Sequence, residues 1–492
     1  MQETRATNDS SEETTVTSHR KSLTAVENNG FVTTTATSTI TTTVRSSSLK
    51  REPRESHAIH AKNATRKGIF KPRSSPLDFD APDHQHPLRG FYILFWMGMA
   101  WYAVTSIFET WMRDGIQFRF SLFYQMSDRG KDLFYSDAAM ILSCFVVIPL
   151  VKLVQYRIIP LNIAWIINSI WLGSWFVTVI SWTTQSGAFA IHCIAMLMKQ
   201  ASYLMSNTEN FWKMYSLVPE LRREIANLES RSSLNVDLEK ELEQAKSELR
   251  QFEGDLNGKI SGLKFPHNLT FLNFIDYMLI PTLVYEIEYP RTEKFRPLYF
   301  FLKAAGTFGT IALLIVIVEN NIVPILVLSD ELNFVTTIMK LIVPFMLCFM
   351  LFICNAFAEL TYFADREFYE DWWNSTTFDE YARRWNKPVH EFLLRHLYLE
   401  TISTYKLSRS NASLLTFFVS SVFHELVMAM TGKRLRPWLF LLQMFQLPLI
   451  MLARIPVIKN NKTLGNVIFW FGMFLGPPLL AALYAREHYM NP

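Results

Sequence analysis

Long apolar blocks separated by polar segments constrain this chain more than any other feature. Each block approaches the roughly 20 residues that a helix needs to cross the hydrocarbon layer of a membrane. With 50% hydrophobic residues, the chain is too apolar for a soluble protein, so the sequence predicts an all-α, polytopic membrane protein. We count about nine spans, at 90–111, 138–156, 159–183, 188–206, 298–325, 335–359, 412–430, 436–454 and 464–485.

The segment before the first block has a different composition. Residues 1–89 are rich in Ser and Thr, with runs such as TTTATSTITTTVRSSS, and poor in large apolar side chains. Such a segment cannot bury a core, so we expect a disordered cytosolic tail. Basic residues outnumber acidic ones between Arg45 and Arg73, which leaves open contact with anionic lipid head groups or regulation by phosphorylation. Residues 90–206 then form a first group of transmembrane helices.

A polar insertion, residues 207–265, separates the first four blocks from the others. Apolar residues recur in it with alternating spacings of four and three, which predicts a helix with a short heptad seam. Two interpretations remain open: an amphipathic helix lying on the protein's own cytosolic face, or a short coiled coil that contributes to self-association. The seam residues are Leu238, Leu242, Ala245, Leu249, Phe252 and Leu256.

An ionisable pair interrupts the block 412–430. His424 lies twelve residues after Ala412, roughly 18 Å along a helix and past the middle of the membrane. Glu425 follows it directly. Ionisable groups at that depth are costly unless they face a cavity or a partner, so His424 is a functional candidate. The alternative is a histidine that packs against a neighbouring helix, which is the interpretation we give His192 in the block 188–206.

Two polar motifs precede that block. The first, FYEDWWN, supplies Phe368, Tyr369, Asp371, Trp372, Trp373 and Asn374. The second, RRWNKPVH, places Asn386 twelve residues after Asn374. An aromatic belt at a membrane interface explains the tryptophans but not the second motif.

Several functional classes are disfavoured. A net charge of +4 is too small to argue for nucleic-acid binding, and the four cysteines all lie inside apolar blocks, where they act as small hydrophobic residues. We find no metal-spaced His and Cys cluster, so no metal is expected. A transporter or scaffold with an intramembrane His/Glu pair is a remote alternative, but the ionisable residues crowd into one region and no inverted repeat is visible.

Taken together, the two motifs and the HEL sequence of the apolar helix resemble the membrane-bound O-acyltransferases. Within that family they are similar to the branch of sterol O-acyltransferases and type-1 diacylglycerol acyltransferases. The segments FLLRHLYLETISTYKLSRSNASLLTFFVSSVFHELVMA and LGNVIFWFGMFLGPPL look closest to fungal sterol ester synthases. The resemblance implies an acyltransferase core over 266–492, helices around a central reaction chamber, and transfer of a long-chain acyl group from acyl-CoA to a membrane sterol such as ergosterol. Acyl-CoA is then a co-substrate, and no cofactor is needed.

The resemblance also assigns roles to residues. It makes His424 the catalytic base and Asn386 its polar partner. Glu425 and Gln446 are candidates for tuning the site or lining the acceptor pocket. Residues matching the acyl-CoA contacts of the family are Arg383, His390, Tyr398, Arg409 and Ser420.

Other expectations follow from the resemblance alone. A diacylglycerol O-acyltransferase shares the motifs and remains the alternative function. The family also implies a multi-pass protein of the endoplasmic reticulum membrane with a cytosolic N-terminus, assembled as a homodimer or homotetramer.

Overall fold

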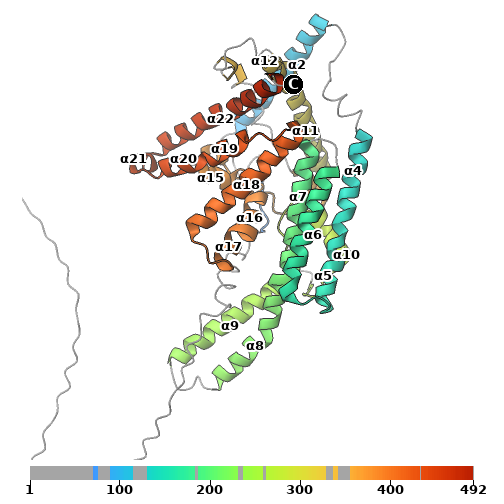
Figure 1. Ribbon diagram of the computed structural model, residues 1–492, viewed down its shortest axis with the longest axis vertical. Helices are drawn as coiled ribbons and strands as arrows, with labels where there is room; N and C mark the ends of the chain where they lie inside the picture. The colour runs from blue at the N-terminus through green and yellow to red at the C-terminus, as the bar shows by residue number, and fades with distance from the viewer. Residues whose placement is uncertain are drawn as a thin grey trace, which may run out of the picture. The chain divides into compact units, whose positions relative to one another are not determined.

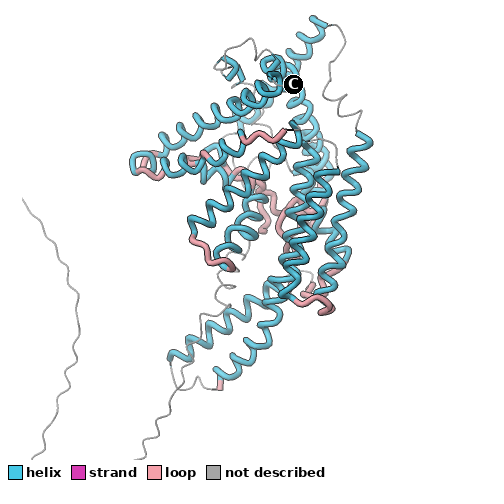
Figure 2. The backbone as a smooth tube through the Cα atoms, viewed as in Figure 1, coloured by secondary structure: helices cyan, strands magenta, loops and turns pink. Residues whose placement is uncertain are grey.

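The computed structural model describes residues 70–75, 89–114, 130–182, 187–230, 236–258, 262–327, 336–338, 340–341, 355–432 and 434–490. All of them lie in one compact unit, Arg54–Pro492. Helices dominate this part of the chain, and it holds isolated bridges between residues but no strand (Figure 2). The all-α prediction is therefore confirmed for the described residues.

Five stretches are long and apolar enough to cross a membrane. The first is Gly130–Gln155, which contains α4 (Gly130–Ser143) and α5 (Val147–Gln155). The other four lie in single helices: α6 (Leu161–Trp182), α11 (Pro297–Ile317), α18 (Arg409–Gly432) and α22 (Lys462–Met490). In α22 the apolar stretch is Lys462–Tyr484. The further helices α2 (Arg89–Asp114) and α7 (Gly187–Met205) also match predicted blocks. The block 335–359 falls largely outside the described residues, and the count of nine spans is not confirmed.

The block 436–454 differs from a single span. It divides at Phe445 into α19 (Trp438–Met444) and α20 (Gln446–Ala453). Pro448 follows in the first turn of α20, where its missing N–H costs least. Phe445 keeps helical backbone angles, and its N–H donates to the Leu441 oxygen at 2.9 Å, so the two helices continue one another. Together they make an apolar stretch, Trp438–Ala453, that is shorter than the five candidate spans.

Helices α6 and α7 lie side by side, and α18 packs against α7 (Figure 1). The main core lies where α5, α6 and α7 meet the segments that follow the polar insertion. Its largest fully buried side chains include Tyr203, Tyr277, Tyr285, Phe211, Phe252, Phe274 and Phe363. His192 of α7 has its Nδ1 2.5 Å from Oδ1 of Asp137 on α4, as expected for a histidine that packs against a neighbouring helix.

The polar insertion folds back on itself. Helix α8 (Phe211–Glu229) and helix α9 (Val236–Leu256) form a helical hairpin, in which Leu242 and Ala245 of the predicted seam pack on Ile225. Phe252 and Leu256, at the end of the seam, join the main core. The heptad seam thus packs against α8 and the core of its own chain, which agrees with an amphipathic helix lying on the protein's own face, and self-association through it stays a prediction.

Part of the N-terminal segment is packed against the core. Phe70 lies edge-on to Tyr289 and Phe363, with ring centroids 5.4 and 5.8 Å apart, and Ser75 is fully buried. The prediction of a disordered tail up to residue 89 is therefore wrong for residues 70–75. Composition missed them because a single large apolar side chain, Phe70, anchors the segment.

Candidate functional site

The FYEDWWN motif folds into a loop whose aromatic side chains face inward. Phe368, Tyr369 and Trp372 are each 7% exposed. The ring of Trp372 lies 5.0 Å from that of Trp385, in the second motif, with the rings at 84°. Such edge-on contacts add to the energy of burial, so these aromatics form a packed cluster rather than a belt at the lipid surface.

Helix α22 holds this loop through polar side chains and close packing. Nδ2 of Asn466 donates to the carbonyl oxygens of Trp373 and Ser375, at 3.2 and 2.9 Å, and Nε1 of Trp470 donates to the same Trp373 oxygen at 3.1 Å. A Cβ atom built on Gly465 would lie 2.9 Å from the Thr376 oxygen. Sequence reasoning did not identify Gly465, Asn466 or Trp470 as residues that hold the loop.

A signal for this contact was present in LGNVIFWFG. Gly465 and Gly472 are seven residues apart, which places both on one helix face. A Cβ atom built on Gly472 would lie 2.5 Å from Cζ of Phe378, so that face has no room for a larger side chain. Small residues at helical spacing often mark such a close approach.

The two motifs are joined by backbone bonds and ion pairs. Glu370 N–H donates to the Arg384 oxygen at 2.9 Å, and Lys387 N–H donates to the Phe368 oxygen at 3.0 Å. Nζ of Lys387 bonds Glu367 at 2.6 Å and Glu370 at 2.9 Å. Burial alone would lower the pKa of Lys387, but these two carboxylates outweigh it and raise that pKa above its usual value. Lys387 is therefore a fixed cation between the motifs.

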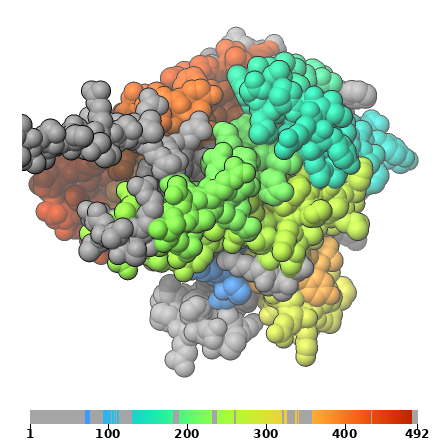
Figure 3. Space-filling model, turned by 90° about the horizontal axis from the view of Figure 1, so that it is seen from below, coloured from blue at the N-terminus to red at the C-terminus, as the bar shows by residue number. Residues whose placement is uncertain are grey.

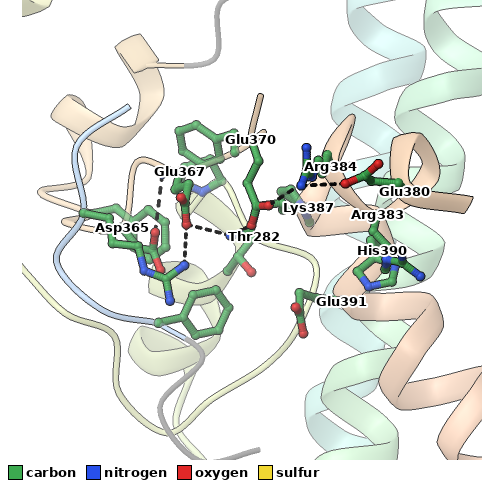
Figure 4. A pocket seen from close by; sticks show the side chains of 16 residues that line it. Thr282, Asp365, Glu367, Glu370, Glu380, Arg383, Arg384, Lys387, His390 and Glu391 are labelled. Atoms are coloured by element: carbon green, nitrogen blue, oxygen red, sulfur yellow. Dashed lines mark hydrogen bonds and ion pairs between the residues drawn. The ribbon is translucent and has the colours of Figure 1, made fainter. Parts of the chain in front are cut away.

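A pocket of about 590 Å³ opens beside this network (Figure 4). Of the residues assigned to acyl-CoA, Arg383 and His390 line it, and Phe368 of the first motif contributes to its wall. Burial lowers the pKa of His390, so its imidazole is neutral near pH 7. The charged groups in the wall are Arg73, Arg383, Arg384, Lys387, Asp365, Glu367, Glu370, Glu380 and Glu391.

Asn386 lies at the start of α16 (Lys387–Leu393). Its Oδ1 accepts a hydrogen bond from Val389 N–H at 3.2 Å, which makes it the N-cap of that helix. Capping uses the side-chain oxygen, so the amide group keeps its N–H donors for another partner. A structural role is thus established for Asn386, and its assigned catalytic role stays a prediction.

His424 lies on α18, one turn after Ser420. Its Nδ1 is 2.8 Å from the Ser420 carbonyl oxygen. Because a carbonyl only accepts, Nδ1 carries the proton, and the lone pair of Nε2 is free to take another. The imidazole is exposed, so the described residues do not enclose it in the chamber that the resemblance implied. His424 and Asn386 are not in the wall of the pocket.

Glu425 has a defined structural role. It is 5% exposed, and its two oxygens accept from Phe440 N–H at 2.9 Å and from the Tyr484 hydroxyl at 2.7 Å. The carboxylate therefore ties α18 to α19 and α22 and fixes the helix that carries His424.

The remaining assigned residues are dispersed. Arg409 is exposed at the first position of α18, and Ser420 is half-buried farther along that helix. Tyr398 is half-buried in the π-helical turn η7 (Leu394–Tyr398). Gln446 is half-buried at the start of α20. None of these four lines the pocket beside the motifs.

A buried lysine, also missed from the sequence, positions the segment after the polar insertion. Nζ of Lys199 on α7 donates to the carbonyl oxygens of Tyr277, Met278 and Ile280, at 2.9, 2.9 and 2.8 Å. These carbonyls lie at and just after the end of helix α10 (Phe271–Leu279), where the chain leaves the helix and few intrahelical donors remain. The segment that follows α10 is thus anchored to α7 at this point.

Comparison with known proteins gives a consistent result. The chain is 33% identical over 459 residues to "Probable sterol O-acyltransferase 1" of Schizosaccharomyces pombe, covering 84% of this chain and 85% of that protein. It is 32% identical over 432 residues to "Sterol O-acyltransferase 2" of Saccharomyces cerevisiae, covering 80% and 66%. The match to "Diacylglycerol O-acyltransferase 1C" of Glycine max is 36% over 240 residues, which is 46% of each chain.

The model of the membrane-bound O-acyltransferase family matches residues 167–485. That range includes both polar motifs, His424 and the part of α22 that holds the motif loop. The chain belongs to the membrane-bound O-acyltransferase family.

Proposed function

We propose that this chain is an acyl-CoA:sterol O-acyltransferase. It transfers a long-chain acyl group from acyl-CoA to the 3-hydroxyl of a membrane sterol. The observation that carries the proposal is the extent of the similarity to sterol O-acyltransferases of yeasts, about 80% of the chain, against 46% for the diacylglycerol enzyme. The sterol-ester product suits storage of sterol.

In the proposed mechanism, Nε2 of His424 accepts the proton of the sterol hydroxyl as its oxygen attacks the thioester carbon. The bond from Nδ1 to the Ser420 oxygen supports this role, since it fixes the tautomer that a base needs. The amide of Asn386 donates to the developing oxyanion. The carbon–sulfur bond then breaks, and the proton held by His424 passes to the coenzyme A thiolate.

Acyl-CoA is proposed to approach through the pocket beside the motifs. Arg383 and His390 lie in its wall, and we propose that they contact the phosphates and adenine of coenzyme A, with Arg383 held in place by its ion pair to Asp379. Tyr398, Arg409 and Ser420 are proposed to contact acyl-CoA farther along its path. We further propose residence in the endoplasmic reticulum membrane, a cytosolic N-terminus and assembly as a homodimer or homotetramer.

The test is expression in cells that lack sterol esterification, followed by assay of their microsomes with labelled oleoyl-CoA, ergosterol and diacylglycerol. We expect the label in sterol ester, and label mainly in triacylglycerol would favour the alternative function. His424→Gln should abolish ester synthesis at unchanged protein level. The matched control is His192→Gln, a histidine of an apolar helix whose ring contacts Asp137, which should retain most activity. An active His424→Gln enzyme would remove His424 from the mechanism.

A further inference from the structure

Residues 70–75, here called the strap, run along the segment that leads into the first motif. Arg73 N–H donates to the Ala364 oxygen at 3.1 Å, and Arg366 N–H donates to the Arg73 oxygen at 3.0 Å. Lys71 N–H donates to Oδ2 of Asp365 at 3.0 Å. These three backbone hydrogen bonds, together with the ring of Phe70 and the side-chain contacts of Arg73 and Ser75, fasten the strap. Such a limited set of contacts on a short segment can open locally without global unfolding.

Two side chains of the strap engage the motif region itself. Nη1 of Arg73 lies 2.5 Å from Oε2 of Glu367, the carboxylate that also binds Lys387. The hydroxyl of Ser75 is 3.3 Å from that of Tyr369, and both residues are buried. The strap is therefore in direct contact with both Glu367 and the FYEDWWN loop.

The strap also completes the wall of the pocket. Phe70 and Arg73 line it together with residues of the motif region, and Figure 4 shows the strap as a pale blue ribbon beside Asp365 and Glu367. In that wall, Arg73 is one of four permanent cations facing five carboxylates. Loss of Arg73 leaves three cations against five carboxylates, which makes the pocket less favourable for an anionic substrate.

We propose that Ser75 is a phosphorylation site that controls whether the strap is docked. A protein kinase transfers the γ-phosphoryl group of ATP to the Ser75 oxygen. The bond from the γ-phosphorus to the bridging oxygen breaks, the serine hydroxyl loses its proton, and ADP leaves. The kinase acts on the strap while it is undocked, because the docked hydroxyl is fully buried.

A phosphate on Ser75 is incompatible with the docked strap. It adds a charge of about −1.5 to −2 at a buried position, on a segment that lies against Asp365 and Glu367. Desolvation and like-charge repulsion both act against redocking, so the modification shifts the population to the undocked state. Ser75 is followed by Pro76, and Lys71 and Arg73 precede it. The blue atoms of the strap reach the surface in Figure 3, so the undocking segment is accessible from outside.

The direct test uses full-length protein in lipid nanodiscs carrying phosphoserine at position 75, with phosphoserine at position 74 as the matched control. Ser74 is only partly buried, whereas Ser75 is fully buried. Hydrogen exchange of the peptide containing Arg366 reports docking, because its N–H bonds the strap. We expect exchange about tenfold faster or more with phosphoserine at 75 and unchanged exchange with phosphoserine at 74. Equal protection in the two proteins would overturn the proposal.

A second readout rests on the proposed function. Undocking should raise the KM for acyl-CoA about tenfold, the effect of losing one charge-assisted contact, with little change in kcat. Ser75→Glu should reproduce this rise and Ser74→Glu should not. Treatment with a Ser-Pro-directed kinase and MgATP should place phosphate on Ser75, and a protein left unmodified there would also count against the proposal. If the wild type made no sterol ester, the proposed function would fail, and the exchange measurement would still decide the strap.

Discussion

Gly472 on α22 offers the sharpest test of how the motif loop is held. A Cβ atom at this position would lie 2.5 Å from Cζ of Phe378, whereas carbon atoms in ordinary contact are about 3.5 Å apart or more. Gly472→Ala therefore forces the ring to move by about 1 Å. Phe378 is 7% exposed and packs on Phe469 at 5.7 Å, so the ring has little room to move. Overpacking of this kind costs about 1–3 kcal/mol.

Alanine also favours a helix over glycine by about 1 kcal/mol, so a matched control is needed to separate the two effects. Gly309 in α11 has no atom within 4 Å of an ideal Cβ built on it. Gly309→Ala should therefore gain the helix propensity of alanine without any clash. The difference in the free energy of unfolding between the two variants then measures the clash alone. We expect Gly472→Ala to be less stable than Gly309→Ala by about 1–3 kcal/mol. The double variant Gly472→Ala with Phe378→Leu shortens the obstructing ring and should recover part of this loss.

The assay is the fraction of purified protein that stays monodisperse on size-exclusion chromatography after heating, together with microsomal sterol esterification. Gly472→Ala should have a midpoint at least about 2 °C below that of Gly309→Ala and a reduced rate of esterification, because α15 (Phe378–Arg384), which Phe378 begins, leads into the second motif. Equal midpoints, or no recovery in the double variant, would refute the claim that α22 and the loop pack at this glycine.

Three further predictions follow from the site. Asn386→Ala removes the N-cap of α16 and should lower stability by about 1 kcal/mol as well as abolish esterification. Asn386→Ser should keep the cap but not the activity. If the serine variant were active, Asn386 would have only the capping role. Burial lowers the pKa of His390 below its usual value of about 6.5, so near that pH the unfolded chain binds more protons than the folded one. Stability should therefore fall as pH drops below about 6.5, and His390→Gln should flatten this part of the pH–stability curve. Glu425→Leu removes the acceptor of Phe440 N–H and should cost about 1–3 kcal/mol in heating assays, while a neutral result would contradict the bond to Phe440.

Hydrophobic length predicted the helices well where one block makes one helix. The blocks 159–183, 188–206 and 412–430 coincide with α6, α7 and α18 to within a few residues, because a run of apolar residues has no other stable form in a bilayer. The same reasoning failed at 436–454. Hydropathy measures how apolar a segment is and does not report where the helix begins and ends, and the helical part here, Trp438–Ala453, is shorter than the candidate spans.

The family resemblance, rather than residue chemistry alone, pointed to part of the pocket wall. Arg383 and His390 were assigned to one function, and the structure places both in the wall of one pocket. Asn466 and Lys199 escaped prediction because each acts on backbone carbonyl oxygens far away in the sequence. Every residue has a carbonyl, so no sequence pattern marks the ones that need a donor.

The contacts of the first motif bear on why it contains so many aromatic and charged residues. Trp372 packs on Trp385, Trp373 offers its carbonyl oxygen to α22, and Glu370 binds Lys387. Each of these contacts joins the loop to a neighbouring element. A loop fixed from several sides keeps the groups that follow it in one geometry, which a reaction between two separate substrates requires. The motif therefore acts as the scaffold for the pocket, and substitutions in it should disturb the affinity for acyl-CoA before they disturb any proton transfer at His424.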